Sequence, residues 1–92
     1  IPADAQVIVS FDVDALDPSV MPAAIGRAPG GLSYWDFVAM LRGVAERARI
    51  AALNVVEFMP ARDIDGLGAL VAGRCIATAL GLIAQQRANA QT

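Results

Sequence analysis

Two apolar segments of strand length, separated by one amphipathic segment, constrain the fold of this chain most strongly. Residues 6–12, QVIVSFD, alternate between two faces of an extended segment, with Val9 and Phe11 on the same face. Residues 50–57, IAALNVVE, form a second segment of this kind. Because strand, helix and strand in this order form a βαβ unit, we expect two parallel strands joined by a right-handed crossover. Apolar residues on both faces predict strands that are buried on both sides.

Residues 33–47 have the pattern of a capped amphipathic helix. Ser33 and Asp36 form an S-x-x-D pair, which resembles the capping box found at helix starts. Trp35 and Met40 lie outside the apolar stripe that we expect to face the sheet. The stripe itself consists of Tyr34, Phe37, Val38, Leu41, Val44, Ala45 and Ala48.

A long loop and an apolar helix complete the predicted order of elements. Residues 13–32 contain three prolines and three glycines and show no helical period, which predicts a loop. Because this loop has few charges and several apolar residues, we expect it to be ordered and functional. A last helix should run from about 66 to 86, with Asp65 as its cap and a polar tail behind it. This helix is apolar around most of its circumference, so we expect it to need further neighbours.

The composition indicates that the chain is part of a larger fold. It is 57% hydrophobic over 92 residues, more than is usual for a soluble domain. A domain of this size buries only a modest fraction of its surface, so its stability alone would be marginal. The sequence also begins IPADAQ, without an initiator methionine, and enters a strand almost at once. We therefore expect a fragment rather than an independent domain.

Charge and cysteine content exclude several classes of protein. The net charge is −2 and no basic cluster is present, which argues against a nucleic-acid partner. The longest apolar run, near residues 75–84, is broken by Thr78 and Gly81 and is too short for a bilayer span, so we expect no membrane partner. The single cysteine, Cys75, cannot form an intramolecular disulfide and suits a cytoplasmic protein. We expect Cys75 to be a small packing residue.

Acidic residues follow both predicted strands. Asp12 and Asp14 close the first, within the stretch SFDVDALDP, and Glu57 closes the second. Ligands bind beyond the carboxyl ends of strands in open α/β sheets, so these three carboxylates should share a crevice. If residues 12–14 are extended, Asp12 and Asp14 face the same way while Val13 turns to the core.

The pair of Asp12 and Asp14 has two possible interpretations, a metal site and a set of loop contacts. Close carboxylates repel each other unless a cation is bound, and oxygen ligands favour hard ions such as Mg²⁺ or Mn²⁺. Alternatively, Asp12 and Asp14 accept hydrogen bonds from loop amides. For Asp17, which precedes a proline, we expect the structural role of holding loop amides. Glu57, expected to be partly desolvated, suits a planar guanidinium partner.

Three segments together give the chain a family resemblance. SFDVDALDP at residues 10–18, PGGL at 29–32 and VEFMP at 56–60 resemble, in this order, the C-terminal part of the ureohydrolases. That family includes the arginases and agmatinases. The closing segment from Asp63 to Ile83 is similar as well, so the likeness covers essentially residues 1–92.

The resemblance implies a fold and a chemistry. The fold is a three-layer α/β/α domain with a parallel sheet, of which this chain is the C-terminal β-loop-α-β-α portion. The activity is Mn²⁺-dependent hydrolysis of a guanidino compound, agmatine or a similar molecule, with release of urea. By analogy Asp12 bridges two Mn²⁺ ions, Asp14 binds one of them, and Glu57 holds the substrate guanidinium. The family also implies a homo-oligomer, or association with the missing part of the domain.

Two departures from the family pattern matter. The chain contains no histidine, whereas the family's other metal ligands and its catalytic histidine lie in segments upstream of this one. We therefore expect no catalytic residue here and an inactive isolated chain. The loop that borders the active-site mouth in the family reads PAAIGRAPGGL, and residues 23–28 replace a small-polar and acidic stretch. This change leaves the substrate open.

Two other classes of function are possible alternatives. A naturally truncated chain would be a non-catalytic structural or assembly module that binds other chains through its apolar helices. A D-x-D glycosyltransferase fragment would use the acids to hold a metal-bound nucleotide sugar, but it gives no role to the PGGL and VEFMP segments.

Overall fold

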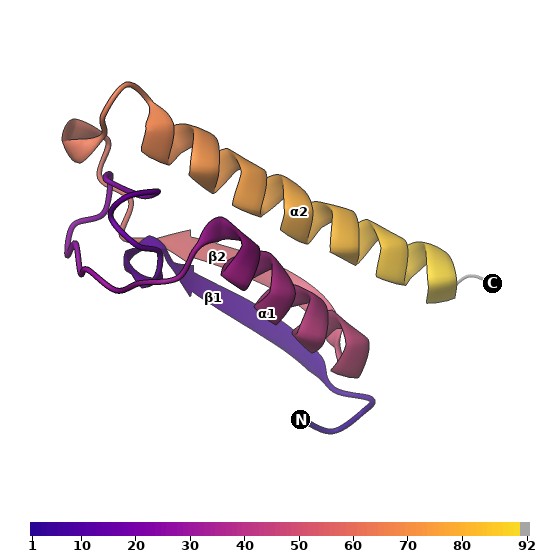
Figure 1. Cartoon of the computed structure of the whole chain (residues 1–92). Coiled ribbons are helices and arrows are strands. Elements are labelled where there is room, and N and C mark those ends of the chain that lie inside the picture. Colours follow the sequence, from indigo (N-terminus) through magenta and orange to yellow (C-terminus); the bar gives the residue numbers. More distant parts are fainter. Residues whose placement is uncertain (91–92) are drawn as a thin grey trace.

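The computed structural model describes residues 1–90, which form one β-loop-α-β-α unit (Figure 1). Strand β1 spans Gln6–Asp12 and strand β2 spans Arg49–Val56. The two strands pair in parallel, with Asp12 opposite Val56 at their carboxyl ends. Helix α1, Tyr34–Arg47, connects them, and helix α2, Leu67–Ala90, follows β2. The predicted mixed α/β architecture with a parallel sheet is therefore confirmed.

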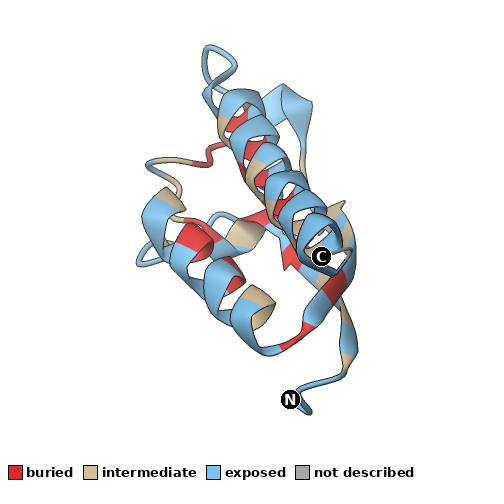
Figure 2. Cartoon of the chain, turned by 90° about the vertical axis from the view of Figure 1, so that its right-hand side faces the viewer, coloured by how far each residue is buried: buried red, intermediate tan, exposed pale blue. Residues whose placement is uncertain are grey.

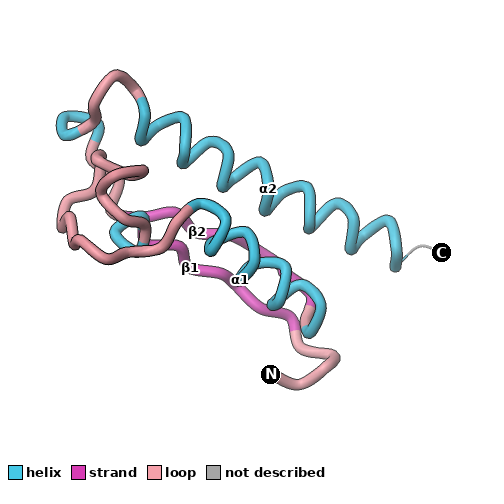
Figure 3. The backbone as a smooth tube through the Cα atoms, in the orientation of Figure 1, coloured by secondary structure: helices cyan, strands magenta, loops and turns pink. Residues whose placement is uncertain are grey.

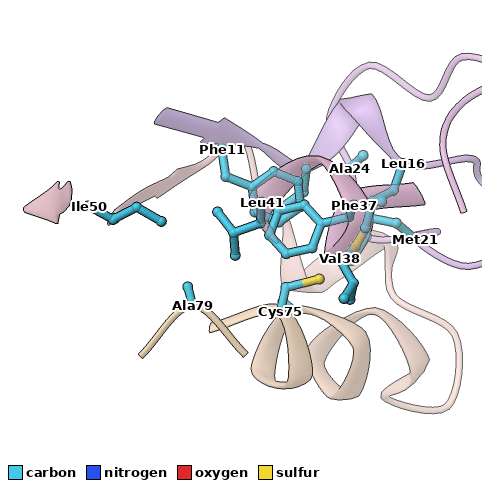
Figure 4. Packing of buried hydrophobic residues seen from close by; sticks show 13 residues of the cluster. Phe11, Leu16, Met21, Ala24, Phe37, Val38, Leu41, Ile50, Cys75 and Ala79 are labelled. Atoms are coloured by element: carbon cyan, nitrogen blue, oxygen red, sulfur yellow. The ribbon is translucent and has the colours of Figure 1, made fainter. Parts of the chain in front are cut away.

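The two helices and the sheet share a single core. Val9 and Phe11 of β1 point into it, and the Phe11 and Phe37 rings pack with centroids 4.4 Å apart. Cys75 and Ala79 of α2 belong to the same buried cluster as the side chains of α1 and the strands, and Figure 4 shows Cys75 beside Val38. Both helices therefore cover the same face of the sheet.

The opposite face of β1 differs from the prediction of a strand buried on both sides. Ile8 is 71% exposed, and Ser10 and Asp12 are exposed as well. The reason is that no described residue covers this face. A third layer, as in the α/β/α arrangement, would have to come from outside the described part of the chain.

Helix α1 begins as its sequence predicts. The Ser33 hydroxyl accepts a hydrogen bond from the Asp36 N–H, and the Asp36 carboxylate accepts one from the Ser33 N–H, a reciprocal capping box. Every residue of the predicted stripe is buried or half-buried, whereas Trp35 and Met40 are 73% and 60% exposed. The helical period therefore identified the buried face correctly.

Helix α2 differs from the prediction at both ends. Asp63, not Asp65, caps it, because the Asp63 carboxylate accepts hydrogen bonds from the N–H groups of Gly68 and Ala69. Asp65 instead takes a left-handed conformation with φ 53°. The expected polar tail is helical through Ala90, because it holds no glycine or proline.

Gln86, at the expected end of this helix, joins three elements. Its side-chain amide donates to the carbonyls of Ala45 and Ala48 and accepts from the Ile50 N–H, at 2.8–2.9 Å. These bonds satisfy carbonyls left open at the end of α1, so α2 fixes the start of β2.

Much of α2 lies open to solvent (Figure 2). Leu70 and Leu80 are 64% and 58% exposed, which agrees with the expectation that this helix needs further neighbours. With 24 residues it is also long and apolar enough to cross a membrane by length and composition alone. The expectation of a run too short for a bilayer is wrong on length, because Thr78 and Gly81 do not interrupt the helix. Such a helix is weak evidence, because core helices of soluble proteins pass the same test.

Candidate metal and substrate site

The candidate site lies at the carboxyl ends of β1 and β2, where the two long loops gather (Figure 3). Because the strands are parallel and Asp12 stands opposite Val56, Glu57 emerges one residue beyond the end of this pair. Asp12, Asp14 and Glu57 therefore come to the same edge of the sheet, as the order of elements predicts.

The backbone between the two aspartates is a turn rather than an extended segment. Val13–Ala15 form one turn of 3-10 helix, and the Asp12 carboxylate caps it by accepting the Asp14 N–H at 2.9 Å. The expected i, i+2 alignment of an extended chain is therefore wrong. Val13 is fully buried, as predicted, and anchors the turn in the core.

Both aspartates keep oxygen atoms available. Oδ1 of Asp12 accepts the Asp14 N–H, and Oδ1 of Asp14 accepts the Gly26 N–H at 3.2 Å. The hydrogen bonds found among residues 1–90 use only Oδ1 of each side chain. Asp12 is exposed and Asp14 half-buried. The pair therefore accepts loop amides, as the second interpretation predicts, and leaves one oxygen of each side chain open, so the metal interpretation stays a prediction.

Asp17 organises the loop, as predicted. Its carboxylate accepts hydrogen bonds from the hydroxyl and N–H of Ser19 and from the N–H groups of Gly30 and Gly31. These bonds, led by the Ser19 hydroxyl, lower the pKa of Asp17 to about 2. The ionised side chain thus closes the loop from residue 17 to residue 31.

Glycine is needed at the two glycine positions of the PGGL segment for different structural reasons. Gly30 takes a left-handed conformation with φ 84°, which favours glycine. At Gly31 a Cβ atom would lie 2.6 Å from the Asp17 nitrogen and 2.7 Å from the Leu16 carbonyl carbon. The loop therefore returns so close to the end of the 3-10 turn that only glycine fits.

Glu57 takes a left-handed conformation, with φ 70°. Its side chain is exposed, so the expected partial desolvation is wrong for this chain, because no described residue covers it. Its carbonyl accepts the Ile25 N–H at 3.3 Å, which ties the end of β2 to the loop that contacts Asp14.

The carboxylates supply part of a metal site at most. Among residues 1–90 no three His, Cys, Asp or Glu side chains are grouped as a cation would require. Two carboxylates with open oxygens nevertheless fit the preference of hard divalent cations for oxygen ligands. Asp12 and Asp14 are therefore suited to complete a site whose other ligands come from elsewhere.

Two hollows in the described part of the chain differ in their relation to the carboxylates. One hollow, about 460 Å³, lies between the C-terminal ends of α1 and α2, around Arg42 and Gln86. A smaller one, about 260 Å³, touches Asp12 but is lined mainly by apolar side chains such as Phe11 and Leu41. The first hollow includes none of the three strand-end carboxylates and the second is mainly apolar, so the carboxylate edge itself is the better candidate for a cation.

Sequence patterns gave no sign of one further feature at this edge. Arg27 and Arg62 each donate hydrogen bonds to main-chain carbonyls across the two loops. Neither belongs to a recognisable motif, because their partners are brought together only by the fold.

Comparison with known proteins identifies the sequence pattern. Residues 1–81 match the sequence model of the family described as the Arginase family. Over 71 residues the chain is 41% identical to the mitochondrial arginase 1 of Arabidopsis thaliana, a match that covers 76% of this chain and 20% of that protein.

Solved structures share the fold. A hypothetical agmatinase from Burkholderia thailandensis superimposes with a TM-score of 0.84 at 30% identity, over 94% of this chain and 27% of that one. The proclavaminate amidino hydrolase from Streptomyces clavuligerus gives a TM-score of 0.83 at 31% identity, over 90% of this chain and 27% of that one. The chain thus spans about a fifth to a quarter of the length of these relatives.

Proposed function

The chain belongs to the arginase family, and we propose that the protein it forms part of hydrolyses a guanidino compound and releases urea. The observation that supports this most directly is the meeting of Asp12, Asp14 and Glu57 at neighbouring ends of two parallel strands. Asp12 and Asp14 supply oxygens that suit a divalent metal, and Glu57 at the neighbouring strand end supplies a carboxylate that suits a guanidinium, which supports the proposal. As in the family, residues 1–92 would be the C-terminal part of a single domain.

Asp12 and Asp14 are the residues that would hold Mn²⁺. When bound, the metal supplies positive charge that lowers the pKa of a water molecule and polarises the substrate. The open oxygens of the two side chains fit this role, and the remaining ligands would belong to other parts of the longer protein. Without those ligands the isolated chain would be inactive.

Glu57 would bind the substrate. Its carboxylate can accept two parallel N–H bonds from a guanidinium, which orients the guanidino carbon as well as attracting the charge. Holding that carbon near the metals lowers the entropic cost of the attack. The sequence contains no histidine, so we assign the proton transfer to the departing amine to residues outside it.

Agmatine is our first candidate substrate, and arginine and shorter guanidino acids are the alternatives. The similar proteins include an arginase, a protein described as an agmatinase and an amidino hydrolase, so the family relationship is compatible with each. In this chain the 22–28 loop contains Arg27 as its single charged residue.

Urea release tests the proposal. The full-length protein, loaded with Mn²⁺, is incubated separately with agmatine, arginine and shorter guanidino acids, and urea is measured colorimetrically. We expect Mn²⁺-dependent urea from at least one of them and none after chelation. No urea from any guanidino compound, with Mn²⁺ content verified, would show that the proposed reaction is wrong.

A further inference from the structure

Two arginine side chains lock the loops at the candidate site to each other. Arg27 donates from Nε to the Pro22 carbonyl and from a terminal nitrogen to the Arg62 carbonyl, both at 2.7 Å. Arg62 in turn donates a hydrogen bond of 2.7 Å to the Ile25 carbonyl. We call these two side chains the arginine latch. It joins segments that lie 35 or more positions apart in the sequence.

The latched segments are the ones that contact the proposed functional residues. Gly26, beside Arg27, donates its N–H to the Asp14 carboxylate, and Ile25 donates its N–H to the Glu57 carbonyl. The segments also pair directly, through a bridge between Ala24 and Phe58. A chain of hydrogen bonds therefore runs from Arg62 through Ile25 to Glu57, and through Gly26 to Asp14.

This arrangement matters most for Glu57. A left-handed backbone is unfavourable for a glutamate and persists only where the surroundings impose it. The carbonyl of Glu57 is held by Ile25, whose own carbonyl is held by Arg62. Hydrogen bonds from a guanidinium to a carbonyl are stronger than neutral ones, so the latch is well suited to impose this geometry.

We propose that Arg27 and Arg62 are positioning residues that fix where the Glu57 carboxylate stands relative to Asp14. This inference rests on the proposed function, because it gives the latch the task of setting the substrate position against the metals. The side chains of Arg27 and Arg62 would contact neither the substrate nor the metal. They act through residues 22–26 of the loop.

Lysine should replace the two arginines with different success. Arg27 uses two nitrogens of its fork toward two separate carbonyls, which a single ammonium reproduces poorly. Arg62 uses one nitrogen toward one carbonyl, so a lysine can replace part of its role. Arg62→Lys should therefore rescue function and Arg27→Lys should not.

The test compares Arg62→Ala, Arg62→Lys, Arg27→Ala and Arg27→Lys in the full-length Mn²⁺-loaded protein. Arg74→Ala, on the exposed surface of α2, is the matched control. We expect Arg62→Ala, which loses one charge-assisted hydrogen bond, to raise KM for the guanidino substrate about tenfold, and Arg27→Ala, which loses two, to raise it at least as much. Mn²⁺ content should stay at the wild-type value.

A second readout does not depend on activity. Amide hydrogen exchange at Ile25 and Gly26 should accelerate about tenfold in the alanine variants and in Arg27→Lys, and stay near wild type in Arg62→Lys and Arg74→Ala. Unchanged KM, or a fall in thermal stability with KM unchanged, would overturn the positioning role. If the wild-type protein releases no urea, the proposed function is wrong, and the positioning role is then wrong as well. The exchange rates still show in that case whether the latch orders the loop.

Discussion

Replacing Gly31 with alanine is the sharpest structural perturbation that the candidate site offers. A Cβ atom there would lie 2.6 Å from the Asp17 nitrogen, 2.7 Å from the Leu16 carbonyl carbon and 2.9 Å from the Ala15 carbonyl oxygen. All three are backbone atoms, so no side chain can turn aside to make room. The loop must instead move away from the 3-10 turn.

The magnitude follows from what that movement breaks. Overpacking of this kind costs about 1–3 kcal/mol. The moved loop would also strain the two bonds that join it to the turn, from the Asp17 N–H to the Leu32 carbonyl and from the Leu32 N–H to the Ala15 carbonyl, both 2.8 Å. At about 1 kcal/mol for each hydrogen bond, the total is about 3–5 kcal/mol.

Two other glycines provide matched controls. Gly30→Ala meets open space but retains the strained φ of 84°, for a cost of roughly 1–2 kcal/mol. Gly43→Ala lies in α1, also in open space, and should stabilise by about 0.5–1 kcal/mol.

Thermal unfolding of the full-length protein ranks these variants. We expect the midpoint of Gly31→Ala to fall by about 4 °C or more, with Gly30→Ala between it and the wild type and Gly43→Ala at or above the wild type. A midpoint for Gly31→Ala equal to that of Gly43→Ala would refute the close approach on which the account of the loop depends.

Three further predictions concern individual side chains. Glu57→Gln should raise KM and lower kcat for the guanidino substrate while Mn²⁺ content stays unchanged, and loss of the metal would contradict its assigned role. Asp17, with its pKa lowered from 3.8 to about 2 by its hydrogen bonds, stabilises the fold above about pH 4 and loses this effect as pH falls toward 2. The thermal midpoint of the wild type should therefore converge on that of Asp17→Asn over this range, and parallel curves would argue against it. Cys75 is fully buried, and burial raises its pKa to about 11, so iodoacetamide at pH 8 should modify it only after unfolding; rapid labelling of the folded protein would be inconsistent with the core.

Local sequence patterns predicted the elements whose causes are local. The alternation in residues 6–12 gave the bounds of β1, and the S-x-x-D pair gave the start of α1. The second strand lies at Arg49–Val56, one residue before the expected range. The cap of α2 was missed because Asp63 reaches the N–H groups of residues five and six positions ahead, across two left-handed residues, Asp65 and Gly66. No short capping pattern describes such a connection.

The candidate site was predictable where it depends on strand ends and unpredictable where it depends on loop contacts. Parallel strands bring Asp12 and Glu57 to one edge whatever the loops do. The arginine latch depends on where the 22–28 loop folds back. That position is set by tertiary contacts of Asp17 and Gly31, which residue spacing does not reveal.

The proposed roles of the strand-end aspartates are tested most directly by Asp14→Ala in the full-length protein, with Asp4→Ala, in the exposed turn before β1, as control. Bound Mn²⁺ and urea release are measured on the same samples. We expect Asp14→Ala to lose both bound Mn²⁺ and Mn²⁺-dependent urea release, and Asp4→Ala to retain both. Wild-type turnover and metal content in Asp14→Ala would contradict the proposed roles.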